Sequence, residues 1–124
     1  MITLDTTTKK LEIGLGGAVA ATEPHVTVCY YDVPGQTKSD FSEYRRATKL
    51  SKTSGATPVT ICEAPSQSGT TRGIVYMCVF NADSGSVTPT IRIDDGGTDY
   101  TQYGQALAAG KSLIYEHGAG WSVI

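Results

Sequence analysis

Short blocks of alternating hydrophobic and polar residues, separated by Gly, Pro, Ser and Asp, run along most of the chain. Alternation with a period of two is typical of strands that turn one face to a core and the other face away from it. In KKLEIGL, Leu11, Ile13 and Leu15 fall on one side of a predicted strand, and Lys10 and Glu12 fall on the other. The pattern predicts an all-β chain.

Further blocks extend this prediction. HVTVCYYDV, residues 25–33, alternates in the same way. TRGIVYMCVF has an uninterrupted apolar centre from Ile74 to Phe80, which predicts a central strand buried on both faces. PVTICEA precedes it, and SVTPTIRID, DYTQYGQALAA, KSLIYE and GWSVI follow it. This spacing predicts a single antiparallel β-sandwich of about eight strands over residues 1–124, with a jelly roll as one possible form.

Two segments break the alternation. The first is the Thr-rich N-terminus, for which we predict an extended polar arm over residues 1–9. The second is a polar stretch that predicts a long loop over residues 33–57. Within it, SDFSEYRRATKL is a candidate for about two helical turns capped by Ser39, because acidic residues precede basic ones.

Charge and hydropathy exclude two classes of partner. Ten basic and twelve acidic residues give a net charge of −2 without a long run of either sign, so we expect no nucleic-acid binding. No stretch approaches the roughly 18–20 apolar residues of a spanning helix, and the N-terminus lacks the pattern of a signal peptide. We therefore expect a soluble chain with no membrane partner.

The three cysteines, Cys29, Cys62 and Cys78, have no CxxC spacing, so neither a zinc finger nor a disulfide framework is indicated. Each lies in an apolar, strand-like run, where a thiol behaves as a small core hydrophobe. An odd number of buried thiols predicts synthesis in a reducing cytosol.

The segment RIDDGGTDY gathers Asp94, Asp95 and Asp99 around Gly96 and Gly97. An EF-hand is excluded because no Glu closes a twelve-residue loop. Glycines that adopt positive φ and turn-favouring aspartates instead predict a hairpin. A looser calcium site on the three aspartates is the alternative that the residues leave open.

Candidate catalytic groups are few. His25 or His117 as a base and Ser112 or Cys62 as a nucleophile lack a nucleophile elbow or a cysteine-protease signature. The glycines of IGLGGAVA lack the Lys and Ser or Thr of a phosphate-binding loop. We predict neither an enzyme nor a cofactor. The seven tyrosines are interpreted as core and interface residues, since amphipathic rings suit both places.

The last third of the chain carries a resemblance. A strand ending in Asn-Ala-Asp is followed by a hairpin, by Leu-x-x-Gly-x-x-Leu-x-Tyr and by Gly-x-Gly-Trp; the residues concerned include Leu107, Gly110, Leu113, Tyr115, Gly120 and Trp121. This region, together with the opening ITLDTTTKKLEI, resembles small virion structural proteins of tailed bacteriophages. The resemblance implies a non-enzymatic protein of the virion, synthesised in the bacterial host cytoplasm and assembled in many copies.

Within that family, a decoration or cement role at capsomer joints is the preferred expectation, with the major capsid protein or other virion proteins as partners. We expect a homo-oligomer, with clusters of three preferred. A tail or neck protein is the nearest rival, and a carbohydrate-binding module that exposes Tyr44, Tyr103 or Trp121 is the rival from another class. The residues expected to make partner contacts are Ile2, Thr3, Leu4, Asp5, Thr6, Thr7, Thr8, Lys9, Phe41, Tyr44, Arg45 and Arg46.

Overall fold

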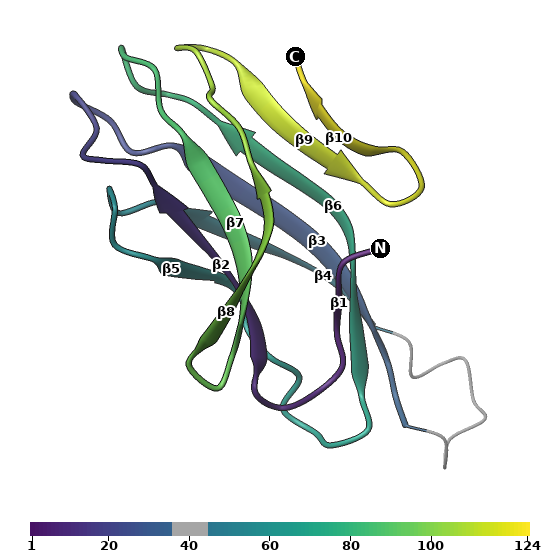
Figure 1. Ribbon diagram of the computed structural model, residues 1–124. Coiled ribbons are helices and arrows are strands. Elements are labelled where there is room, and N and C mark those ends of the chain that lie inside the picture. Colours follow the sequence, from purple (N-terminus) through teal and green to yellow (C-terminus); the bar gives the residue numbers. More distant parts are fainter. Residues whose placement is uncertain (36–44) are drawn as a thin grey trace.

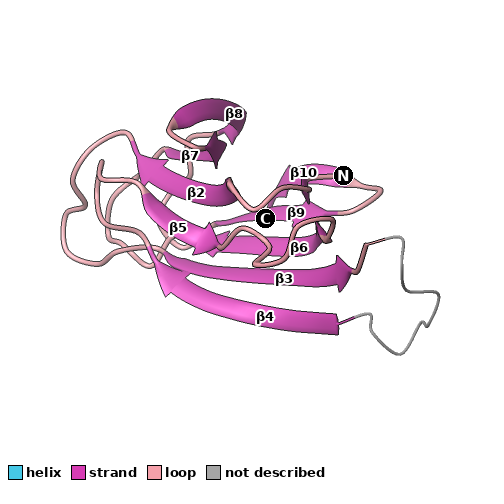
Figure 2. Cartoon of the chain, turned by 90° about the horizontal axis from the view of Figure 1, so that it is seen from below, coloured by secondary structure: helices cyan, strands magenta, loops and turns pink. Residues whose placement is uncertain are grey.

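Two antiparallel sheets face one another in the computed structural model, which describes residues 1–35 and 45–124 (Figures 1 and 2). The prediction of an all-β sandwich is confirmed, although the described residues form ten strands where about eight were expected. The strands are β1 (Thr3–Leu4), β2 (Lys9–Leu15), β3 (His25–Val33), β4 (Arg45–Lys52), β5 (Val59–Cys62), β6 (Thr71–Phe80), β7 (Pro89–Asp95), β8 (Thr98–Gly104), β9 (Ser112–Glu116) and β10 (Gly120–Val123).

The larger sheet has six strands in the order β10-β9-β6-β3-β4, and β1 pairs with β6 beside this path. The central place predicted for residues 74–80 is confirmed, since β6 lies between β9 and β3. Its predicted burial on both faces is wrong. Ile74, Met77 and Val79 are buried, whereas Cys78 is half-buried and Phe80 is exposed, as expected where only one face meets a core.

The smaller sheet has four strands in the order β5-β2-β7-β8. Strands β7 and β8 form the predicted hairpin, with Asp95 opposite Thr98 in the register. The two glycines between them have φ values of 61° and 102°, so they adopt the left-handed conformation that a tight hairpin needs.

The core lies between the sheets and is continuous. Alternate residues of the inner strands supply most of it, including Leu11 and Ile13 from β2, Val26 and Val28 from β3, and Leu113 from β9, all with 0–1% of their surface exposed. At about 25 cal/mol per Å² of apolar surface removed from water, this burial is the main force that holds the sheets together.

The N-terminal segment corrects a prediction, because it is not an arm outside the sandwich. Ile2 and Leu4 are 6% and 0% exposed, and β1 pairs with Gly73 and Arg72 of β6. The Ile2 amide donates a hydrogen bond to the Tyr115 hydroxyl at 2.9 Å. Beyond this point β6 has no β9 residue beside it, so the short segment fills the gap in the sheet. Two apolar residues among the polar ones were enough to bury it.

The predicted loop over residues 33–57 is also corrected. Residues 45–50, the second half of the helix candidate, belong to β4, which runs to Lys52 and pairs with β3 from His25↔Lys52 to Asp32↔Arg45. The remaining residues of that candidate, 39–44, lie outside the described part of the chain. RRATKLSK contains one large apolar residue, so its sequence shows no strand pattern; pairing with β3 determines its conformation.

One end of the sandwich is held by a buried carboxylate. Asp83 is 5% exposed and accepts hydrogen bonds from the amides of Ala20, Ala21 and Thr22 at 2.8–3.0 Å. Hydrogen bonds from these backbone amides, with Thr22 the largest contributor, lower the pKa of Asp83 to about 2. Its charge therefore ties the β2–β3 connection to the segment that follows β6.

Candidate functional site

No described segment of the chain covers the side of the six-stranded sheet that faces away from the core (Figure 2). The strand registers arrange its side chains in three rows that run across β4, β3, β6 and β9. We call these twelve residues the outer face: Lys52, His25, Phe80 and Ser112; Leu50, Thr27, Cys78 and Ile114; Thr48, Cys29, Tyr76 and Glu116.

The middle row gives this face its apolar character. Leu50 is 74% exposed and Phe80, in the next row, is 38% exposed. Cys78 and Tyr76, the next outward-facing residues along β6 after Phe80, are half-buried, while neighbouring side chains leave Ile114 only 8% exposed. Large apolar side chains gathered on one surface are a feature of interaction sites more often than of free surfaces.

Two shallow hollows lie along β3 and β4 on this face. One, of about 520 Å³, is lined by His25, Thr27, Leu50 and Lys52 among others. The other, of about 390 Å³, is lined by Cys29, Arg46, Thr48 and Val75 among others. They make the face uneven without forming an enclosed cavity, which suits contact with protein side chains better than capture of a small molecule.

The cysteines divide between the core and this face, which corrects the prediction that all three are buried. Cys62 is fully buried, and burial raises the pKa of its thiol to about 11. Cys29 and Cys78 are half-buried on the outer face, where Cys29 lies 3.4 Å from the Thr48 hydroxyl. Desolvation, followed by the neighbouring Cys78, raises the pKa of Tyr76 between them. All three thiols are free.

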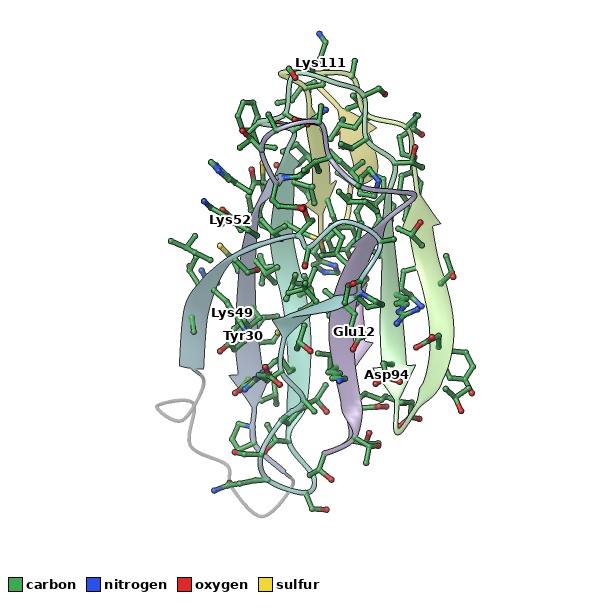
Figure 3. The ribbon with its side chains drawn as sticks, turned by 90° about the vertical axis from the view of Figure 1, so that its left-hand side faces the viewer. Glu12, Tyr30, Lys49, Lys52, Asp94 and Lys111 are labelled. Carbon is green, nitrogen blue, oxygen red and sulfur yellow. The ribbon has the colours of Figure 1, made fainter. Side chains whose placement is uncertain are left out.

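The opposite outer surface, on the four-stranded sheet, is charged and internally paired. Glu12 lies 3.1 Å from Lys10 and 2.9 Å from Arg92, and Arg92 also reaches Asp99 at 2.8 Å. Lys10 lies 3.5 Å from Asp94. Figure 3 shows Glu12 and Asp94 on this side of the molecule, and Lys49 and Lys52 of β4 on the other.

The hairpin aspartates do not converge. The Asp94 carboxylate accepts a hydrogen bond from the Gly97 amide at 2.9 Å, Asp95 accepts one from the Thr8 hydroxyl at 2.6 Å, and Asp99 pairs with Arg92. Within residues 1–35 and 45–124, no three His, Cys, Asp or Glu side chains gather in a way that would hold a metal ion. The described ranges also contain no helix long and apolar enough to cross a bilayer.

A second polar cluster lies where the C-terminal end of β3 pairs with the N-terminal end of β6. The Arg72 guanidinium donates to both carboxylate oxygens of Asp32 at 2.7 and 2.9 Å, donates to the Glu63 carbonyl at 2.8 Å, and lies 4.3 Å from the Tyr30 ring centre. Arg72 is therefore fully engaged within the chain, and we interpret this cluster as structural.

The partner-contact residues predicted from the sequence fall in different places. Ile2 and Leu4 are buried and Thr3 is half-buried, whereas Asp5, Thr6, Thr7 and Thr8 form an exposed turn before β2. The Lys9 ammonium lies 2.6 Å from Asp5 within the same turn. Arg45 and Arg46 belong to β4, with Arg46 exposed, and Phe41 and Tyr44 lie outside the described residues. The predicted contact set is thus not one surface.

Two of the three aromatic residues considered for sugar binding, Tyr103 and Trp121, are engaged within the sandwich, and the third, Tyr44, lies outside the described residues. Trp121 is half-buried and stacks on Tyr103 at 4.6 Å between ring centres with 6° between planes. Tyr115 lies 4.9 Å from the same indole. Tyr103 thus already occupies an indole face that a sugar would need. These rings close the open side of the sandwich between β8 and β10.

Comparison with known proteins adds no relative: no family model, no curated protein and no solved structure matches the chain. The candidate site therefore rests on the fold and its side chains. Sequence reasoning missed the outer face, because its members come from four strands and only their register brings them together. The only signal in the sequence was Leu50, a lone large apolar residue in the cationic segment RRATKLSK.

Proposed function

We propose that this chain is a non-enzymatic structural protein of a tailed-bacteriophage virion, and that it assembles through the outer face. The observation that carries the binding role is the exposure of Leu50 and Phe80 on a sheet whose other side already fills the core. Such a face lowers the free energy of the system when a partner covers it, by about 25 cal/mol per Å² of apolar surface.

The virion assignment is supported by the resemblance, and the structure explains what its residues do. Leu107, Leu113 and Tyr115 are core residues, and Gly110 and Gly120 have φ values of 74° and 84°. The motif therefore describes turns and packing of this sandwich, and the contacts with a partner come from other residues. A decoration role on the head, with the major capsid protein as partner, is the form of the proposal that we favour.

Many copies of such a chain would hold a shell together by multivalent attachment, because each additional contact acts at high effective concentration. Synthesis in the bacterial cytoplasm agrees with three free thiols. A tail or neck position would use the same face and the same chemistry, so the place of binding has to be measured on particles.

The test is to add purified chain to phage heads that lack it and to image the particles by cryo-electron microscopy. Regular density on the shell is expected for the wild type and for Tyr100→Asp, a control at a residue 55% exposed on β8. Reduced occupancy is expected for Leu50→Asp. Density confined to the tail or neck would move the assignment there, and no density on any part of the particle would overturn the virion role.

A further inference from the structure

We propose that the occupant of the outer face is a second copy of this chain, related by a two-fold axis that runs between β3 and β6, parallel to the strands. The inference deepens the proposed function and rests on it only in using the same face: the chain first pairs with itself through the outer face, and the pair is the unit that attaches to the particle. A two-fold contact is self-complementary, so every residue on the face must tolerate the residue that symmetry places over it. The three rows of the outer face meet this condition.

The axis places β4 of one copy over β9 of the other and β3 over β6, so each row lies over itself in reverse order. In the middle row Leu50 then covers Ile114 of the second copy, and Thr27 covers Cys78. The most exposed apolar residue of this face thus meets the apolar residue at the other end of its own row.

Charge favours this axis, parallel to the strands, over a two-fold axis perpendicular to the strands. The outward-facing residues of β4 include the cationic Arg46 and Lys52 and no anionic one, whereas Glu116 of β9 is exposed at the opposite side of the face. An axis parallel to the strands places Glu116 over Thr48 of the second copy, one side-chain position from the exposed Arg46. An axis perpendicular to the strands would stack the two cationic β4 strands, which costs free energy because like charges repel.

The size of the face suits a weak dimer. Strands lie about 4.8 Å apart and rise about 3.3 Å per residue, so the 32 residues of β3, β4, β6 and β9 cover roughly 500 Å² in projection. Side-chain relief adds to this figure. Specific interfaces at the low end bury about 600–800 Å² per partner. We therefore expect a dimer whose population rises steeply with concentration.

The experiment is sedimentation velocity on the full chain over a wide concentration range under reducing conditions. The wild type and Tyr100→Asp are expected to pass from one copy to two, and Leu50→Asp to weaken the dimer by more than about tenfold. Arg46→Glu and Glu116→Arg are each expected to weaken it, and the double variant to restore it. Circular dichroism verifies the fold of each variant, all of which change exposed residues.

Alkylation gives an independent readout. Cys29 and Cys78 lie on the face, so their rates of alkylation are expected to fall as the dimer forms, while Leu50→Asp keeps them high. A mass of one copy at every concentration, a mass of three copies, or equal behaviour of Leu50→Asp and Tyr100→Asp would overturn the proposal. If Arg46→Glu and Glu116→Arg each weaken the dimer but the double variant does not restore it, the placement of the axis is overturned.

The two proposals fail separately. A chain that stays single yet decorates phage particles through Leu50 refutes the second copy and keeps the virion role, with a capsid protein as the occupant. A chain that dimerises as described but leaves particles bare keeps the dimer and refutes the virion role.

Discussion

The two outer surfaces of the sandwich have opposite chemistry, although the strands beneath them serve the same core. On the four-stranded sheet, Lys10, Glu12, Arg92 and Asp99 form a chain of ion pairs at 2.8–3.1 Å. On the six-stranded sheet, the outer face leaves Leu50 74% exposed. The first surface satisfies its charges within one molecule, and the second leaves apolar area in water.

This difference shows which constraints folding imposes and which it leaves free. Alternation makes every second residue of an inner strand a core residue, as Leu11 and Ile13 of β2 and Val26 and Val28 of β3 show in the two sheets. The residues in between carry no such requirement, so their character reflects what the surface meets outside the chain. A surface whose charges are paired needs no partner, whereas an apolar one gains from covering.

The same negative charge is expected to have opposite effects on the two sides of β6. Val79 is 0% exposed and its neighbour Phe80 is 38% exposed. Val79→Asp is expected to cost more than about 4 kcal/mol, because it buries an unpaired carboxylate, and to abolish folding. Phe80→Asp is expected to stay folded. Circular dichroism and urea unfolding measure both, and a folded Val79→Asp variant would contradict the two-sided assignment of β6.

Truncation of Leu4 tests whether the N-terminal segment belongs to the core or to a surface. Leu4 is fully buried in β1, so Leu4→Ala is expected to lower the free energy of unfolding by about 2–5 kcal/mol. Thr7→Ala, in the exposed turn that follows, is the control and is expected to change it by less than about 0.5 kcal/mol. If Leu4→Ala and Thr7→Ala change the free energy of unfolding equally in urea titrations, residues 1–9 form a free arm and not part of the core.

Removal of Arg92 tests the paired surface. Arg92→Ala takes one of two cationic partners from Glu12, which is 7% exposed, and the expected loss is about 1–2 kcal/mol, since Lys10 and solvent still screen the carboxylate. Added salt is expected to lower the free energy of unfolding of the wild type toward that of Arg92→Ala, because salt screens the ion pairs. Thr48→Ala, on the outer face, is the comparison variant. If Arg92→Ala is as stable as Thr48→Ala in urea at low salt, the ion pairs do not stabilise the fold.

The pH dependence of stability tests Asp83, a carboxylate that lies on neither of the two outer surfaces. Backbone amides lower the pKa of folded Asp83 to about 2 from an ordinary value of 3.8, so Asp83 stabilises the folded chain above pH 3.8. This contribution is lost as pH falls from 3.8 through 2. The melting temperature of the wild type should therefore fall more steeply across this window than that of Asp83→Asn. Parallel curves in thermal scans would show that the three amide bonds do not couple to stability.

The sequence predicted those parts of the fold that local patterns determine. Leu11, Ile13 and Leu15 alternate with polar residues and are buried, and the Gly96–Gly97 pair marks the hairpin where it occurs. Strand β4 escaped prediction because its only large apolar residue points outward, so the usual signal of a buried face is absent. The N-terminal segment escaped because Ile2 and Leu4 are too short a pattern to distinguish from an arm.

The candidate site could not be predicted for a different reason. Leu50, Cys78 and Ile114 lie in one row, yet 28 and 36 residues separate them along the chain. Their contact depends on the register of three strand pairs, and a shift by one residue would send each to the core side. Register follows from the whole core, so it becomes visible only in three dimensions.

The hydrogen bond between the Ile2 amide and the Tyr115 hydroxyl has a consequence for the time course of folding. It joins residues 113 positions apart, and β1 depends on β6, which lies far along the chain. The entropy of closing so long a loop has to be lost before these contacts form, which slows folding. During synthesis β1 can pair only after residues 72 and 73 of β6 have left the ribosome, and the hydrogen bond to Tyr115 can form only later still.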